Sequence, residues 1–198
     1  EGGYRYNGKL YGMPMDTTNL LGCFYNKDVF EEAGITELPT NWDEFTAVCE
    51  KIKAIGKTPL YYSGSDSWTL QCFTHFGINK EVFDSGLTYN EFWDEMNTNK
   101  RHYSECADFA DAIARSKEVI DKGYVQETYL SDTYDMAQTA LAQGEAGMYV
   151  NATWVVDEIA SKYPEAVENI GAFVLPLYED TENYTDSSLP GAIGITTA

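Results

Sequence analysis

The sequence predicts an α/β domain with inserted helices. Short apolar runs typical of strands are interspersed with amphipathic stretches typical of helices, and in the middle of the chain several helical stretches follow one another without a strand between them. A chain of 198 residues is long enough to bury a core, and its 14% of aromatic residues is too high for a disordered acidic chain. We therefore expect one folded domain of mixed strands and helices.

The N-terminal part predicts two strands and then a helix. Residues 10–15 and 20–25 are short apolar runs separated by polar residues. Asn41, or Thr40 before it, can cap a helix whose apolar positions step by three and four residues until Gly56 ends it.

The middle of the chain predicts one strand followed by helices. Residues 58–62 have strand character, and Ser67 can cap a helix through Trp68. Thr88 and Glu91 have the spacing of a capping box before another helix. A longer helix is expected to open at Ser104, with a buried face made of Phe109, Ala110, Ile113, Ala114 and Ile120.

The C-terminal part of the chain is predicted to alternate between helix and strand. A helix is predicted from Asp132 or Thr133 to Gly144, a strand over 145–150, a helix over 153–162 and a strand over 170–175.

Charge and missing motifs exclude several functions. The chain has 13 Lys and Arg against 32 Asp and Glu, a net charge of -19, so it repels nucleic acids and acidic membranes. It contains no GxGxxG, no GxxxxGK[ST] and no GxSxG sequence, and only two histidines. We therefore expect no cofactor and no enzymatic constellation.

A metal site is weighed because Cys72 and His75, and His102 and Cys106, have ligand-like spacings. Neither pair lies in the tight turn that usually holds structural zinc ligands, so these residues are not expected to converge on a metal. The four cysteines match no disulfide framework, and no disulfide is expected to be needed for folding.

Aromatic residues beside short polar residues are the stronger functional signal. Trp154 follows Asn151 where a strand gives way to a helix, Trp68 follows Asp66 at a second junction, and Tyr134 lies at a third. Such rings and polar groups suit a sugar, whose CH faces pack on rings while its hydroxyls bond carboxylates and amides. From composition alone, however, a Trp in the first turn of a helix is more often a core residue.

Three stretches carry a family resemblance. They are YNKDVFEEAG (25–34) with PTNWDEF (39–45), ALAQGEAGMYVNATW (140–154), and IGAFVLP (170–176). In this order they resemble family 1 extracellular solute-binding proteins, the carbohydrate-binding subunits of ABC importers, of which maltodextrin-binding protein is a distant relative. The chain departs from the family pattern at Ala152, often Gly, and at Val174, often Pro.

The resemblance implies the second lobe of a two-lobed, type II periplasmic-binding-protein-like fold. Residues 1–19 would be the first hinge crossing, 20–190 the ligand-binding lobe and 191–198 the returning hinge strand. The first lobe, a signal peptide and a lipid-anchoring Cys would then lie outside this sequence. Tyr25 and Trp42 belong to the signature but are expected to pack inside the lobe.

The resemblance also implies a set of site residues. Trp154 matches the sugar-stacking Trp, and Tyr134 falls in a segment that supplies aromatic contacts. Asp16 or Asn19 would supply a polar contact from the crossing segment. Trp68 and Asp66 would contribute from the loop after the third strand, and Asn151 from the strand end.

The expected function is to bind an extracellular mono- or oligosaccharide and deliver it to the permease subunits of an ABC importer. The protein would be extracytoplasmic, either periplasmic or held on the cell surface by a lipid anchor. The alternatives are a solute-binding protein for a polyamine or glycerol phosphate, and a carbohydrate-active enzyme. As half of a clamp, the chain is expected to bind sugar no tighter than about 1 mM, and Trp154→Ala to abolish binding without affecting the fold.

Overall fold

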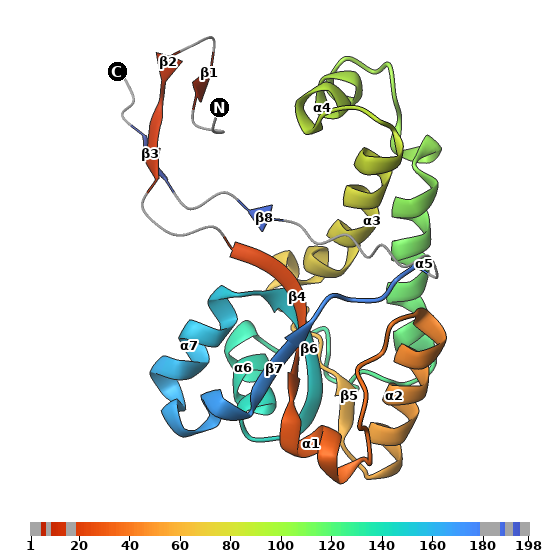
Figure 1. Cartoon of the computed structure of the whole chain (residues 1–198), viewed down its shortest axis with the longest axis vertical. Helices are drawn as coiled ribbons and strands as arrows, with labels where there is room; N and C mark the ends of the chain where they lie inside the picture. The colour runs from red at the N-terminus through yellow and green to blue at the C-terminus, as the bar shows by residue number, and fades with distance from the viewer. Residues whose placement is uncertain (1–4, 7–8, 15–18, 179–186, 189–191, 195–198) are drawn as a thin grey trace.

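A mixed β-sheet with the strand order β5-β6-β4-β7 forms the centre of the molecule, and β8 pairs with the start of β4. The computed structural model describes residues 5–6, 9–14, 19–178, 187–188 and 192–194 (Figure 1). The strands of this sheet are β4 (Asn19–Asn26), β5 (Thr58–Leu60), β6 (Ala146–Ala152), β7 (Ile170–Phe173) and β8 (Ser187–Ser188). β5 runs parallel to β6, whereas β4 runs antiparallel to β6 and β7. The predicted strands over 20–25, 58–62, 145–150 and 170–175 are confirmed, although β5 ends at Leu60 and β7 at Phe173.

The sheet separates two hydrophobic cores. Cys23, Met148 and Val150 belong to one core, and their chain neighbours Phe24 and Tyr149 belong to the other. This division follows from the alternation of side chains between the two faces of a strand. The helices on the two faces are visible in Figure 1, with α6 and α7 on one side and α2 on the other. The helices next to the sheet are α1 (Lys27–Glu32), α2 (Trp42–Ala54), α6 (Tyr134–Ala142) and α7 (Trp154–Lys162), and η3 (Pro164–Asn169) follows α7.

Helix α2 forms as its sequence predicts. The Asn41 side chain accepts a hydrogen bond from the Glu44 amide at 2.9 Å and so caps the first turn. Hydrogen bonds from the backbone and hydroxyl of Thr40 hold the pKa of Glu44 below its ordinary value. Gly56 ends the helical segment with φ of +79°, a left-handed conformation that glycine adopts without strain. Trp42 of the signature is buried, and Tyr25 packs against the same core, as expected.

The inserted helices lie between β5 and α6 along the chain. They are η1 (Ser67–Leu70), α3 (Gln71–Asp84), α4 (Tyr89–Asn97), η2 (Tyr103–Glu105) and α5 (Ala107–Asp121). The predicted capping box of α4 is confirmed, because the Thr88 hydroxyl accepts from the Glu91 amide at 3.3 Å and Glu91 accepts from the Thr88 amide at 2.9 Å. The predicted cap at Ser67 is wrong, since Asp66 holds the cap position of η1 and makes no side-chain cap.

The predicted buried face of α5 is confirmed only in part. Phe109 and Ile120 pack against the hydrophobic clusters, whereas Ile113 is 48% exposed and Ala110 and Ala114 are exposed; Ala112 and Val119 are fully buried instead. The reason lies in the partner helix, where a Cβ on Gly77 would come within 2.6 Å of the Ala112 Cβ. The missing side chain lets α5 approach α3 along the Ala112 stripe, so the larger apolar side chain at Ile113 faces outward.

The end segments pair with each other outside the main sheet. β3 (Gly12–Pro14) runs antiparallel to β9 (Ala192–Gly194), with Met13 opposite Ile193. A separate ladder joins β1 (Arg5–Tyr6) to β2 (Lys9–Leu10). In Figure 1 these short strands lie apart from the α/β body. Among the described residues, no helix has both the length and the apolar character needed to cross a bilayer.

Candidate functional site

One edge of the sheet brings several predicted site residues together. β5 and β6 are parallel, with Leu60 opposite Met148, so their carboxyl ends lie at the same edge. β4 is antiparallel to β6, with Leu21 opposite Ala152, so the first residues of β4 lie at this edge too. The edge of an α/β sheet outside the carboxyl ends of its parallel strands is a common ligand position.

Three aromatic side chains lie at this edge, and we call them the aromatic platform: Trp68, Tyr134 and Trp154. The Trp68 ring centroid lies 5.1 Å from that of Tyr134 in an edge-on arrangement and 6.3 Å from that of Trp154. Trp68 is 41% exposed, while Tyr134 and Trp154 are half-buried. Three residues separated by up to 86 positions in the sequence thus form one partly exposed apolar surface.

The loop before Trp68 is fixed to the start of α6. The Asp66 carboxylate accepts a hydrogen bond from the Tyr134 amide at 2.7 Å, and the Gly64 amide donates to the Tyr129 carbonyl at 2.7 Å. A Cβ on Gly64 would lie 2.6 Å from that carbonyl oxygen, so only glycine permits this approach. Asp66 therefore fixes the loop that carries Trp68 to the helix that carries Tyr134, and it remains partly exposed itself.

A buried carboxylate supports this loop from below. Asp132 is 4% exposed and accepts hydrogen bonds from the hydroxyls of Tyr61 (2.6 Å) and Thr128 (2.7 Å) and from the Gln126 amide (3.1 Å). Burial opposes the charge, but these hydrogen bonds outweigh it, and the pKa of Asp132 lies below its ordinary value. The Asp132 carbonyl in turn accepts from the Ser65 amide at 3.1 Å.

A second buried layer lies under Tyr134, and sequence reasoning missed it. Tyr149 is 2% exposed, and its ring centroid lies 6.3 Å from that of Tyr134. Its hydroxyl shares a 2.8 Å hydrogen bond with Ser63, which also bonds Thr69 at 2.9 Å. Burial raises the pKa of both Tyr134 and Tyr149, so both hydroxyls stay protonated at neutral pH. Tyr149 stands within the signature run, but nothing in its neighbours along the chain indicates Ser63 as its partner.

The polar residue Asn19 lies beside the start of α7. Its side-chain oxygen accepts from the Thr153 hydroxyl at 3.0 Å, and the Thr153 amide donates to the Leu20 carbonyl at 3.0 Å. Asn19 is half-buried, and the Thr153 that it contacts is the residue directly before Trp154 in the chain. A ligand stacked on Trp154 would therefore find an amide group nearby.

Two predicted site residues do not join this surface. Asn151 is fully buried, because every residue of the central strand β6 is buried between its neighbouring strands, and its side-chain oxygen accepts from the Ala152 amide at 2.8 Å. Asn151 therefore does not belong to the exposed surface, and its contact with a ligand stays a prediction. Asp16 lies outside the described residues.

Cys72 and Cys106, the two cysteines considered as metal ligands, are buried in different hydrophobic clusters. Cys72 belongs to the main core, where burial raises its pKa to about 12, and Cys106 belongs to a small cluster with Ile78 and Phe92. Across the part of the chain that the structure describes, no three His, Cys, Asp or Glu side chains gather in a way that could hold a metal ion.

Fold and site together define an α/β lobe that offers an aromatic, polar-rimmed surface at its sheet edge. The family model described as Bacterial extracellular solute-binding protein matches residues 1–197. The chain therefore belongs to this family, and the resemblance of the signature runs is confirmed.

Individual relatives agree with this assignment. The Multiple sugar-binding protein of Streptococcus mutans is 31% identical over 173 residues, which make up 87% of this chain and 40% of that protein. A solved chitin oligosaccharide binding protein superposes with a TM-score of 0.74 at 27% identity, covering 96% of this chain and 46% of that one. The apo form of RafE from Streptococcus pneumoniae superposes with a TM-score of 0.71 at 27% identity, covering 98% of this chain and 48% of that one. The chain thus spans less than half the length of each of these relatives, and the predicted fold class is confirmed.

Proposed function

We propose that this chain is the second, ligand-binding lobe of an extracellular sugar-binding protein that serves an ABC importer. The observation that carries the proposal is the aromatic platform at the sheet edge, with the polar groups of Asn19 and Asp66 beside it. Aromatic faces match the CH faces of a pyranose, and the amide and carboxylate match its hydroxyls. The names of the similar proteins, which bind sugars, support the same ligand class.

The lobe division is part of the proposal. Residues 1–19 and 191–198 would be the two hinge segments, and 20–190 the lobe itself. The antiparallel pairing of β3 with β9 supports this division, because two crossings between lobes would run side by side in opposite directions. A ligand would be clamped by hinge closure, with a first lobe supplying the remaining contacts.

Partners and location follow from the family as part of the same proposal. The loaded protein would dock on the permease subunits of the importer outside the cytoplasm, in a periplasm or on a cell surface with a lipid anchor. The net charge of -19 speaks against nucleic acid as a partner. The site binds and releases its ligand without a covalent step, so we propose no enzymatic activity.

Calorimetric and NMR titration of the 198-residue chain with saccharides tests the proposal. The panel contains raffinose, chito-oligosaccharides and manno-oligosaccharides, with spermidine and glycerol phosphate as the rival ligands. We expect saccharide binding at about 1 mM or weaker, because one lobe supplies only part of the contacts and water competes for every hydroxyl. Trp68→Ala should reduce this binding at least about tenfold, since it removes the most exposed ring of the platform.

The matched control is Phe83→Ala, which removes another exposed aromatic side chain, 60% exposed, near the end of α3 and away from the platform. It should leave saccharide binding unchanged. Binding of spermidine in preference to every saccharide would overturn the sugar assignment. Micromolar saccharide affinity in this chain alone would contradict the half-clamp interpretation.

A further inference from the structure

Two loops carry members of the aromatic platform, and hydrogen bonds join one loop to the other. Residues 61–66 lead from β5 to η1 and so to Trp68, and residues 126–133 lead into α6 and so to Tyr134. Because Trp68 follows the first loop and Tyr134 follows the second, the distance between the two rings depends on how the loops join. The bonds between their backbones, each from amide to carbonyl, are Gly64 to Tyr129 (2.7 Å) and Ser65 to Asp132 (3.1 Å).

A buried carboxylate gathers side chains from both loops onto one oxygen atom. Asp132 is 4% exposed, and its Oδ2 accepts from the Tyr61 hydroxyl of the first loop at 2.6 Å. From the second loop, the same oxygen accepts from the Thr128 hydroxyl at 2.7 Å and from the Gln126 side-chain amide at 3.1 Å. Hydrogen bonds to a charged acceptor are about twice as strong as those between neutral groups, so three donors on one oxygen favour a carboxylate over an amide.

Gln126 extends this junction to the residues just after β5. Its side-chain oxygen accepts from the Tyr62 amide at 3.2 Å, and its side-chain nitrogen donates to the Tyr62 carbonyl as well as to Asp132. The two bonds to Tyr62 hold the first loop where it leaves the sheet. Loss of the contacts of Asp132 would therefore loosen both the loop that leads to Trp68 and the loop that leads to Tyr134.

We propose that Asp132 is a positioning residue of the ligand site, whose buried carboxylate fixes Trp68 and Tyr134 in the arrangement that stacks a sugar ring. With 4% exposure it lies too deep to contact a ligand itself. Rings that are held in place before a ligand arrives avoid the entropy cost of being ordered on binding, so the junction raises affinity without adding a contact. The proposal rests on the proposed function and adds to it a residue that acts only through its neighbours.

Asp132→Asn and Tyr61→Phe test the proposal in the 198-residue chain, because both weaken the junction and nearly keep the shape of the side chain. Each variant is titrated by NMR with raffinose, chito-oligosaccharides and manno-oligosaccharides. We expect binding to be about three- to tenfold weaker than in the unmodified chain. In the free variants, the nuclear Overhauser effects between the Trp68 and Tyr134 rings, whose centroids lie 5.1 Å apart, should weaken as well. Tyr61→Phe removes one donor and leaves two, so it keeps the test decisive should Asp132→Asn not fold.

The control for Tyr61→Phe is Tyr124→Phe. Tyr124 is 1% exposed, and its hydroxyl donates to the Glu50 carboxylate at 2.6 Å, the same length as the bond that Tyr61 makes. Tyr124 belongs to the core that faces α2, whereas Tyr61 belongs to the core that faces α6 and α7. Tyr124→Phe should therefore lower the midpoint of urea unfolding as Tyr61→Phe does. It should leave saccharide binding and the contact between Trp68 and Tyr134 unchanged.

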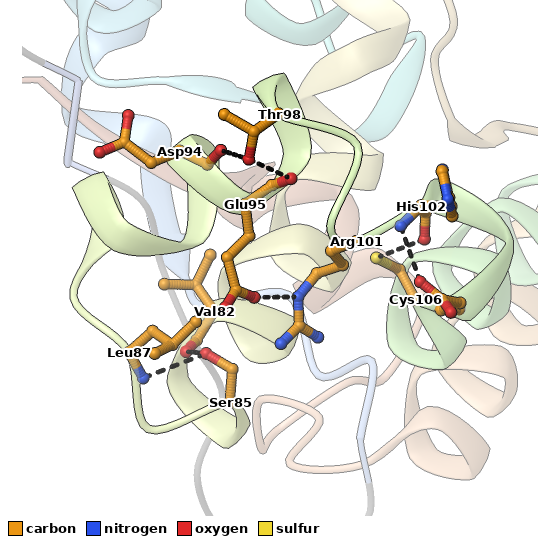
Figure 2. Close-up of polar contacts among 10 residues, drawn as sticks. Val82, Ser85, Leu87, Asp94, Glu95, Thr98, Arg101, His102 and Cys106 are labelled. Carbon is orange, nitrogen blue, oxygen red and sulfur yellow. Dashed lines mark hydrogen bonds and ion pairs between the residues drawn. The ribbon is translucent and has the colours of Figure 1, made fainter.

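The control for Asp132→Asn is Glu95→Gln, another change of a carboxylate to its amide. Figure 2 shows the Glu95 carboxylate of α4 accepting from the Arg101 guanidinium, at 3.2 Å. The same guanidinium lies 5.0 Å from the centre of the Phe92 ring, which belongs to the small hydrophobic cluster of the inserted helices. This cluster shares no residue with the platform, so Glu95→Gln removes an equal charge and should leave saccharide binding unchanged.

The outcomes separate this proposal from the proposed function. Asp132→Asn and Tyr61→Phe that bind saccharide as tightly as the unmodified chain would overturn the positioning role and leave the proposed function standing. A loss of affinity in Tyr124→Phe equal to that in Tyr61→Phe would overturn it too, because affinity would then follow the stability of the whole lobe. An unmodified chain that binds no saccharide of the panel would overturn both.

Discussion

Single residues of the platform differ in how far they also hold the lobe together. Trp68 is 41% exposed and touches mainly Tyr134 and Trp154. Trp154 is half-buried and packs against both hydrophobic cores. The sequence-based expectation that Trp154→Ala leaves the fold unaffected does not agree with this packing.

We therefore predict that the two tryptophan variants differ in their free energy of unfolding. Trp154→Ala should lower the free energy of unfolding by about 1–3 kcal/mol, since it removes packing from two cores, and Trp68→Ala by less than about 1 kcal/mol. Urea unfolding followed by circular dichroism measures both, with Phe83→Ala as the exposed control. Equal losses for Trp68→Ala and Trp154→Ala would contradict the packing argument.

The sequence predicts the positions of the platform residues at the starts of helices, but it does not predict the buried hydrogen bonds that support them. Trp68, Tyr134 and Trp154 each stand at a junction where a helix begins, and the topology of parallel strands brings such junctions to one edge. The bond between Ser63 and Tyr149 joins positions 86 residues apart, and no local pattern encodes it. The burial of Asn151 could not be predicted either, because a polar residue at a strand end gives no sign that its strand is central and fully covered.

Among the helices, α3 and α5 form the closest packed pair of the insertion. A Cβ on Gly77 would lie 2.6 Å from the Ala112 Cβ and 2.7 Å from the Asp108 carbonyl oxygen. Neither neighbour is the flexible end of a side chain, so the helices would have to separate. Phe109 of α5 lines a small pocket beside α3 and α4, and it would move with the helix.

Gly77→Ala should accordingly destabilise the protein by about 1–3 kcal/mol in spite of the better helix propensity of alanine. Hydrogen exchange should localise the loss to α3 and α5. Gly22→Ala is the matched control, because its Cβ would meet nothing closer than 3.4 Å, and it should be tolerated. Unchanged exchange protection in α5 of the Gly77→Ala protein would show that the two helices are less tightly packed than these distances indicate.

Local sequence signals predict helices well and their orientation less well. The cap at Asn41 and the box at Thr88 and Glu91 depend only on residues within one turn, so the sequence reveals them. The buried stripe of α5 depends on a glycine in another helix. Periodicity alone favours the stripe with the larger apolar residue, Ile113, whereas close approach selects the one with Ala112.

For the whole molecule, charge repulsion acts against compactness. The 32 acidic residues outnumber Lys and Arg by 19. Ion pairs such as Lys57 with Glu32 (3.0 Å) and Lys122 with Glu118 (2.6 Å) involve partly exposed side chains. Pairs of this kind contribute only about 0–1 kcal/mol each. The unpaired negative charge is brought closer together in the folded lobe than in the unfolded chain, so repulsion destabilises the fold at low salt.

Salt should therefore stabilise the protein. Between 10 and 150 mM NaCl the screening length falls from ~30 Å to ~8 Å, which removes repulsion between distant carboxylates while short-range contacts persist. We expect a gain of about 1 kcal/mol, which corresponds to a rise in Tm of roughly 2–4 °C for a chain of this size. Thermal unfolding at pH 7, followed by circular dichroism at several salt concentrations, measures the shift.

Screening can be separated from general salting-out by the shape of the curve. Because the screening length changes most at low ionic strength, most of the rise should occur below ~150 mM, and NaCl and KCl should give the same curve. Exclusion of ions from the apolar surface would instead add stability steadily up to molar concentrations. A Tm that falls between 10 and 150 mM would mean that the surface ion pairs outweigh the repulsion, and that the acidic surface of this lobe is better paired than a net charge of -19 implies.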